Sequence, residues 1–161
     1  TPTPSPTPSR PSQPFVMITY NSEDNLTGIP PPSPGSVWYQ SFTSTLNGKF
    51  TKFQFSKDGY QPGEQLTVKI LEGEGIGGNV LHTGTWTLPL DNTGWVGYDI
   101  GGGGVPLILN QKYSIQLLTS NNNPLAGFLG TDPGGYTGGY FFWDGYGGEY
   151  GDLWFKIWVT T

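Results

Sequence analysis

Short apolar segments that alternate with polar residues, each ended by a turn sequence, constrain this chain more than any other feature. Phe53 and Phe55 flank a polar residue, and Leu66 and Val68 repeat the pattern. A period of two places successive side chains on opposite faces of a β-strand. Eight segments predicted to be strands span 37–44, 49–56, 65–72, 79–86, 94–100, 112–119, 138–143 and 152–160. No segment has a sustained 3.6-residue period, so we expect almost no helix.

The spacing of these segments predicts the fold. Turn sequences such as Asn47-Gly48 and Asp91-Asn92 separate them. Short strands at such spacing are typical of sandwiches and barrels, and a chain of 161 residues with six Trp, nine Tyr and nine Phe can fill a core. We therefore predict an all-β fold, an antiparallel jelly-roll β-sandwich of about 8–10 strands over residues 36–161.

Composition excludes several function classes. Twelve Asp and Glu outnumber seven Lys and Arg, giving a net charge of −5 with no basic cluster, so we expect no nucleic-acid partner. No apolar run has transmembrane length, so we expect no membrane span. There is no cysteine, and the single histidine, His82, cannot form a zinc site or a catalytic triad by itself. We expect His82 to lie on a strand surface.

The first 14 residues have a different composition. Proline alternates with Thr or Ser in TPTPSPTPSRPSQP. Proline fixes its own φ and disfavours helix in the preceding residue, so residues 1–14 should form a polyproline tail about 43 Å long. Such tracts in secreted proteins are commonly O-glycosylated. The candidate glycosylation sites are Thr1, Thr3, Ser5 and Thr7 in the tail, and Asn25 in the sequon Asn25-Leu26-Thr27. With a chain that begins at Thr1, this favours an extracellular or cell-surface location.

From Gln40 onward the chain contains a series of short motifs. They are Gln40-Ser41-Phe42, Leu66-Thr67-Val68, Thr93-Gly94-Trp95-Val96, Tyr113-Ser114-Ile115, the Gly-Gly-Tyr at 138–140 and the closing stretch 151–156. This layout resembles a family of jelly-roll domains in extracellular and surface proteins of bacteria and archaea. The resemblance implies a sandwich similar in shape to carbohydrate-binding modules, and its motifs belong mostly to the fold, so they indicate little about activity.

The segment after the tail, Phe15 to Tyr20, is apolar on both faces of a strand. Such a strand suits burial on both sides. It is either the first strand of its own sandwich or a donor strand that fills a groove in the next copy. Head-to-tail donation does not close and therefore builds a filament. We predict a structural subunit of an extracellular filament, whose partners are copies of itself and attached glycans. Residues 15–35 would be the donor segment, with Phe15, Val16, Met17, Ile18 and Tyr20 at the subunit interface.

The dense aromatic residues near the C-terminus support an alternative function. A row of exposed rings can stack on sugars, so a non-catalytic carbohydrate-binding module is the alternative prediction. The candidate platform residues are Tyr140, Trp143, Tyr146 and Tyr150, whereas Phe142 and Phe155 are assigned to the core.

Acidic residues in loops offer weaker candidates. Asp132, Asp144 and Asp152, with Glu149, could supply oxygen ligands to calcium, although no spaced loop signature is present. A glycosidase needs two carboxylates, and Glu72 with Glu74 is one available pair. Acids beside glycine are common in turns, so we expect no catalytic site.

Overall fold

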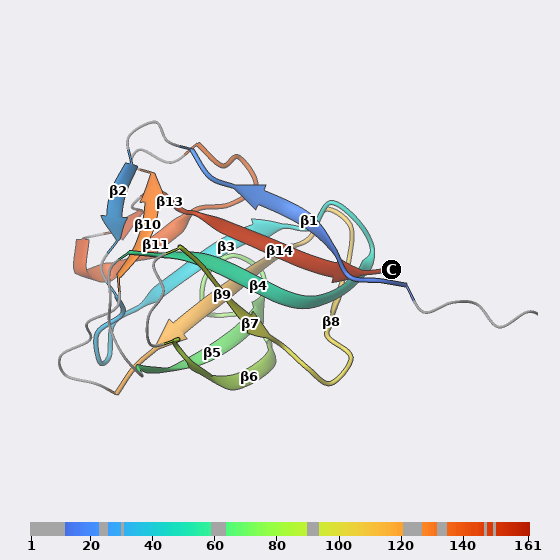
Figure 1. Cartoon of the computed structure of the whole chain (residues 1–161), viewed down its shortest axis with the longest axis horizontal. Helices are drawn as coiled ribbons and strands as arrows, with labels where there is room; N and C mark the ends of the chain where they lie inside the picture. Colours follow the sequence, from blue (N-terminus) through green and yellow to red (C-terminus); the bar gives the residue numbers. More distant parts are fainter. Residues whose placement is uncertain are drawn as a thin grey trace, which may run out of the picture.

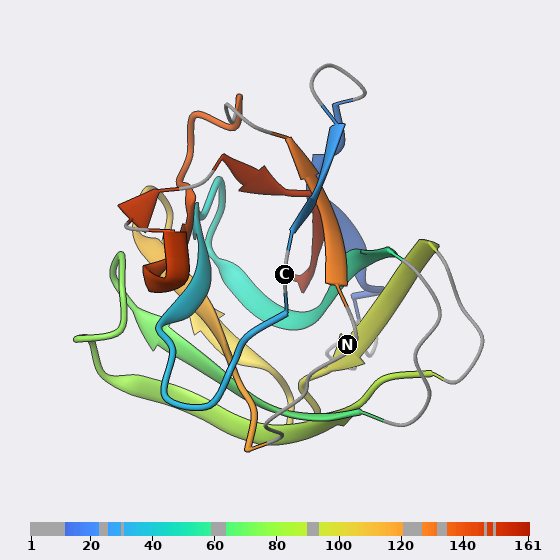
Figure 2. The same ribbon diagram turned by 90° about the vertical axis from the view of Figure 1, so that its left-hand side faces the viewer.

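The computed structural model describes residues 12–22, 26–29, 31–58, 64–89, 94–120, 127–131, 135–146, 148–149 and 151–161. In these residues the strands form two antiparallel sheets that pack face to face as a β-sandwich (Figures 1 and 2). One 3-10 turn, Asp144–Tyr146, is the only helical element described. The predicted all-β class with almost no helix is therefore confirmed. No helix in this part of the chain is long and apolar enough to cross a membrane.

The larger sheet has eight strands arranged around β4 (Gly48–Asp58). Its main order is β1 (Phe15–Tyr20), β14 (Phe155–Thr160), β4, β10 (Gly127–Thr131) and β13 (Asp152–Leu153). Three more strands join it: β2 (Leu26–Ile29) pairs with β10, and both β7 (Gly94–Asp99) and β8 (Val105–Leu107) pair with β4. The long β4 accepts so many partners because different stretches of its edges are used by different strands.

The smaller sheet has six strands and forms the opposite layer. Its order is β12 (Gly148–Glu149), β11 (Phe141–Trp143), β3 (Trp38–Thr43), β9 (Lys112–Leu118), β5 (Gln65–Glu72) and β6 (Val80–Thr87). The sequence-predicted strand over 65–72 coincides with β5. Together the described sheets hold more strands than the 8–10 expected. The excess comes from β2, β8, β12 and β13, which are only two to four residues long and therefore too short for a pattern of alternation to identify them.

Aromatic side chains from both sheets fill the core. Phe53 on β4 contacts Trp86 on β6 at 5.2 Å between ring centroids, edge to face. Phe155 is fully buried, as expected. The assignment of Phe142 to the core is wrong: Phe141 is the buried residue, and Phe142 faces outward and stacks on Tyr39 at 5.3 Å. The strand alternates as predicted, but its phase is shifted by one residue.

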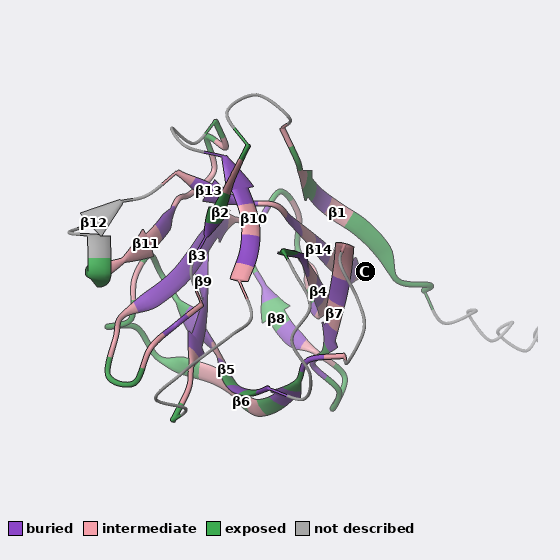
Figure 3. Cartoon of the chain, turned by 60° about the vertical axis from the view of Figure 1, so that its left-hand side comes forward, coloured by how far each residue is buried: buried purple, intermediate pink, exposed green. Residues whose placement is uncertain are grey.

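Strand β1 lies at the edge of the eight-stranded sheet, antiparallel to β14 of the same chain. Figure 3 shows its exposed first half, whereas the residues of β14 alternate between buried and intermediate. Ile18 is buried, but Phe15 is 41% and Val16 36% exposed. Within one chain these two residues are therefore not buried on both faces, since an edge strand has one neighbour and one open edge.

Candidate ligand-binding surface

The outer face of the eight-stranded sheet carries two tryptophans. Trp95 on β7 and Trp158 on β14 are half-buried, whereas the residues next to them, Val96 and Ile157, are buried in the core. Alternation along each strand therefore turns both indoles outward. We call this surface the tryptophan face, and it consists of Lys52, Gln54, Trp95, Gly97, Lys156 and Trp158.

Each tryptophan on this face has a lysine beside its ring. The Lys156 ammonium nitrogen lies 4.2 Å from the Trp95 ring centroid, and that of Lys52 lies 5.8 Å from the Trp158 centroid. The Trp158 Nε1 donates a hydrogen bond of 3.2 Å to the Gln54 Oε1. Cation–π attraction at exposed sites contributes about 0.5–1 kcal/mol, so each contact favours the observed position of the ammonium group over its ring.

The strand register sets the spacing of the two rings. Trp95 pairs with Ser56 of β4, and Trp158 pairs with Lys52 of the same strand on its other side. Strand rise and strand spacing place the two positions roughly 17 Å apart along the diagonal of the sheet. Gly97 lies between them, and a Cβ added there would meet the Lys52 Cε at 2.7 Å. Glycine therefore leaves room for the lysine stem to cross the face.

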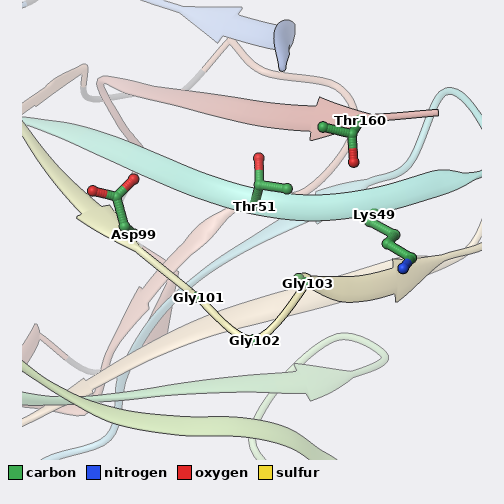
Figure 4. Close-up of a pocket in the computed structure, with 8 residues that line it drawn as sticks. Lys49, Thr51, Asp99, Gly101, Gly102, Gly103 and Thr160 are labelled. Atoms are coloured by element: carbon green, nitrogen blue, oxygen red, sulfur yellow. The ribbon is translucent and has the colours of Figure 1, made fainter. Parts of the chain in front are cut away.

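A shallow hollow of about 480 Å³ adjoins the tryptophan face. Figure 4 shows Asp99 and Lys49 at its two ends with the Thr51 hydroxyl between them. Thr160 and the loop 101–104 complete the lining. Asp99 pairs with Lys52 in register, so the hollow continues the tryptophan face at the end of β7.

The loop that borders the hollow depends on four consecutive glycines. Gly101 to Gly104 all have positive φ, from 57° to 84°. Other residues rarely adopt this backbone conformation. At Gly104 a Cβ would also lie 2.6 Å from the Phe50 carbonyl oxygen. The glycines thus let β7 turn into β8 closely against β4.

The aromatic platform predicted near the C-terminus is arranged differently. Tyr140 is half-buried and its hydroxyl is hydrogen-bonded to that of Tyr39 at 3.1 Å, while Trp143 packs against the core. The side chain of Tyr146 and all of Tyr150 lie outside the described residues. Of the predicted platform, the structure therefore places Tyr140 in a small aromatic group with Tyr39 and Phe142, and turns Trp143 inward.

Asp152 occupies a buried position between the sheets. It accepts a hydrogen bond from the Gln40 side-chain amide at 3.1 Å and one from the Tyr136 backbone N–H at 3.0 Å. The Leu153 N–H donates to the Gln40 Oε1 at 2.8 Å. Burial raises the pKa of the Asp152 carboxyl to about 6, although both hydrogen bonds oppose the increase. This carboxylate links β13 to β3 and does not face solvent.

The other calcium candidates do not join Asp152. Asp144 is exposed in the 3-10 turn, whereas Asp132 and the side chain of Glu149 lie outside the described residues. In the part of the chain that the structure describes, no three His, Cys, Asp or Glu side chains are grouped to hold a metal ion.

The remaining polar candidates have structural partners. Glu74 is paired with Lys112, and Glu72 accepts a 2.7 Å hydrogen bond from the Asn79 amide. His82 lies on β6 as expected, with its Nε2 2.8 Å from the Tyr98 hydroxyl, and burial lowers its pKa. The candidate glycosylation sites Thr1, Thr3, Ser5, Thr7 and Asn25 lie outside the described residues.

Comparison of the chain with protein-family models gave no match, and comparison with curated proteins found no similar sequence. The tryptophan face was not predicted from the sequence. A signal for it exists, because Trp95 and Trp158 each alternate with core residues along their strands. The high density of aromatic residues at 136–150 instead predicts a platform in that segment.

Proposed function

We propose that this chain is a non-catalytic carbohydrate-binding module of a secreted or cell-surface protein, and that it binds sugars on the tryptophan face. The observation that carries this proposal is the outward placement of Trp95 and Trp158 on adjacent parts of one sheet. Indole rings combine a large apolar surface with a polar N–H, which suits the apolar faces and hydroxyls of sugar rings. The resemblance to jelly-roll surface domains agrees with this function.

The polar groups around the rings fit the same ligand. The Gln54 amide oxygen accepts from the Trp158 indole, and the Thr51 hydroxyl, which donates to the Trp158 carbonyl oxygen at 3.3 Å, lines the adjoining hollow together with Asp99. Specific sites combine apolar surface with a few placed polar groups. An open face rather than a deep cavity suits a long chain that passes over the sheet.

Replacing Trp95 or Trp158 by alanine should lower the affinity for a bound polysaccharide by about 3- to 10-fold each, which is the effect of losing one aromatic contact. Affinity gel electrophoresis against a panel of soluble polysaccharides measures this change. Retained affinity in both variants would contradict the proposal.

The Tyr140→Phe and Trp143→Ala variants are the matched controls. Both residues belong to the aromatic segment predicted from the sequence, and neither lies on the tryptophan face. They should bind normally. Loss of binding in these variants alone would return the site to the six-stranded sheet.

A second candidate function is the filament subunit, and the position of β1 favours it. This strand has one described neighbour, β14, and its open edge carries the exposed Phe15 and Val16. Ile18 of β1 is buried and Met17 and Tyr20 pack against the core, so transfer of the strand to β14 of another copy would exchange these contacts for equivalent ones. Exposed edges with apolar side chains are templates for pairing between chains. Head-to-tail exchange of β1 would then extend a filament.

A reversible cross-link tests the exchange of β1. Thr19 of β1 is in register with Lys156 of β14, and neighbouring strands place such pairs within disulfide reach. In a Thr19→Cys/Lys156→Cys variant, oxidation of the monomer should block filaments and reduction should restore them, as judged by electron microscopy. Because the chain has no other cysteine, the single variants serve as controls. Filaments that form equally from the oxidised monomer would exclude exchange of β1.

A further inference from the structure

We infer that the ligand of the tryptophan face is an acidic polysaccharide, one that carries carboxylate or sulfate groups along its chain. This inference rests on the proposed carbohydrate-binding function and specifies its ligand class. The chain as a whole is acidic, with a net charge of −5. A positively charged surface on this chain therefore depends on where the few lysines lie.

Three of the chain's lysines gather at this one place. Lys52 and Lys156 lie on the tryptophan face, and Lys49 lines the adjoining hollow. Asp99 is the one acid that lines the hollow. The described part of this surface is thus positively charged, whereas the molecule is negatively charged.

The other described lysines lie elsewhere in the molecule. Lys57 is buried and donates to the Pro89 carbonyl oxygen at 3.1 Å, and Lys112 is paired with Glu74. Lys69 lies on the opposite sheet. Among the described residues, no ion pair involves Lys52 or Lys156. Their ammonium groups therefore retain the capacity to bind an anion.

The positions of the lysines and tryptophans allow charge recognition and ring stacking to act on the same ligand. Each ammonium lies over an indole ring, so a ligand unit that stacks on the ring displaces the lysine, and the displaced ammonium stays close enough to contact the anionic group of the same unit. Two such ring–lysine pairs lie roughly 17 Å apart, further than one sugar extends, which favours a polymer. Charge-assisted hydrogen bonds are about twice as strong as neutral ones. An acidic polysaccharide is the class of ligand that can contact both the indole ring and the ammonium group at each of the two pairs.

A pair of polymers with the same backbone tests the inference. Polygalacturonate carries carboxylates, and its methyl ester is uncharged. The whole chain should bind polygalacturonate about tenfold more tightly than the ester in titration calorimetry. Added salt should reduce this difference, because both lysines lie on the outer face of the sheet and are only partly buried. Dextran sulfate compared with dextran tests whether sulfate esters serve equally well.

Variants separate the charge from the stacking. Lys52→Gln combined with Lys156→Gln should reduce the affinity for polygalacturonate to that for its methyl ester and leave the ester unaffected. Lys69→Gln is the matched control on the other sheet and should change neither affinity. Trp95→Ala combined with Trp158→Ala should weaken binding to both polymers.

The outcomes distinguish this inference from the function on which it rests. Equal affinity for acid and ester, with both dependent on the tryptophans, would overturn the acidic specificity and leave the carbohydrate-binding function standing. Binding that needs the lysines but not the tryptophans would be attraction to polyanions in general and would overturn the inference. If none of the four polymers bound, both the function and the inference would be overturned.

Discussion

Replacing Trp38 by alanine should lower the free energy of unfolding by about 3–5 kcal/mol, the usual cost of removing a fully buried aromatic side chain. Trp38 is completely buried on β3. Its ring meets Phe141 of the same sheet edge to face at 4.9 Å. It also contacts Phe128 of the opposite sheet at 5.6 Å. Removing it would leave a cavity where the two layers meet, and the sheets cannot close over it without breaking strand pairing.

Urea denaturation of the unchanged protein and the Trp38→Ala variant measures this loss of stability. The midpoint should fall while the slope of free energy against urea concentration stays the same. Trp158→Ala is the matched control, since it removes the same side chain from the outer face. It should cost about 1 kcal/mol or less, because the indole is half-exposed and loses one hydrogen bond. Equal destabilisation by the two substitutions would mean that Trp38 is not the packing centre of the sandwich.

The strands that could be predicted are those whose alternation is complete. β5 buries Leu66, Val68 and Ile70 at every second position, β14 buries Phe155, Ile157 and Val159, and β4 repeats the pattern at Phe53 and Phe55. β2, β8 and β10 were not predicted, because they are short and contain Gly or Pro. Their backbone pairs with β4 or β10, and this pairing depends on the tertiary fold rather than on their own sequences.

The candidate site shows a different limit. Aromatic density near the C-terminus suggested a platform around Trp143, but density does not reveal which rings are buried. Alternation reveals which rings face outward, because Trp95 and Trp158 each stand next to a buried residue along their strands. The contact between Gln40 and Asp152 could not be predicted, because 112 residues separate the two side chains in sequence.

The buried carboxylate of Asp152 should make the protein more stable at mildly acidic pH than at neutral pH. Its pKa is about 6 in the folded chain and 3.8 ordinarily. Between these values the folded chain keeps a proton that the unfolded chain has lost, so stability falls as pH rises. The contribution is fully present below pH about 4, is lost as pH rises through about 6, and amounts to about 2–3 kcal/mol.

The Asp152→Asn variant isolates this effect, because the amide does not titrate. Free energies of unfolding are measured for both proteins between pH about 4 and about 7, and the difference between them reports Asp152 alone. His82 contributes with the opposite sign, since burial lowers its pKa, but it is present in both proteins and cancels. The absolute stability of the variant is a poor readout, because its amide N–H group would face another donor, either Gln40 or the Tyr136 N–H. A pH-independent difference would mean that Asp152 ionises as readily in the folded chain as in the unfolded one, and that its position between β13 and β3 is open to water.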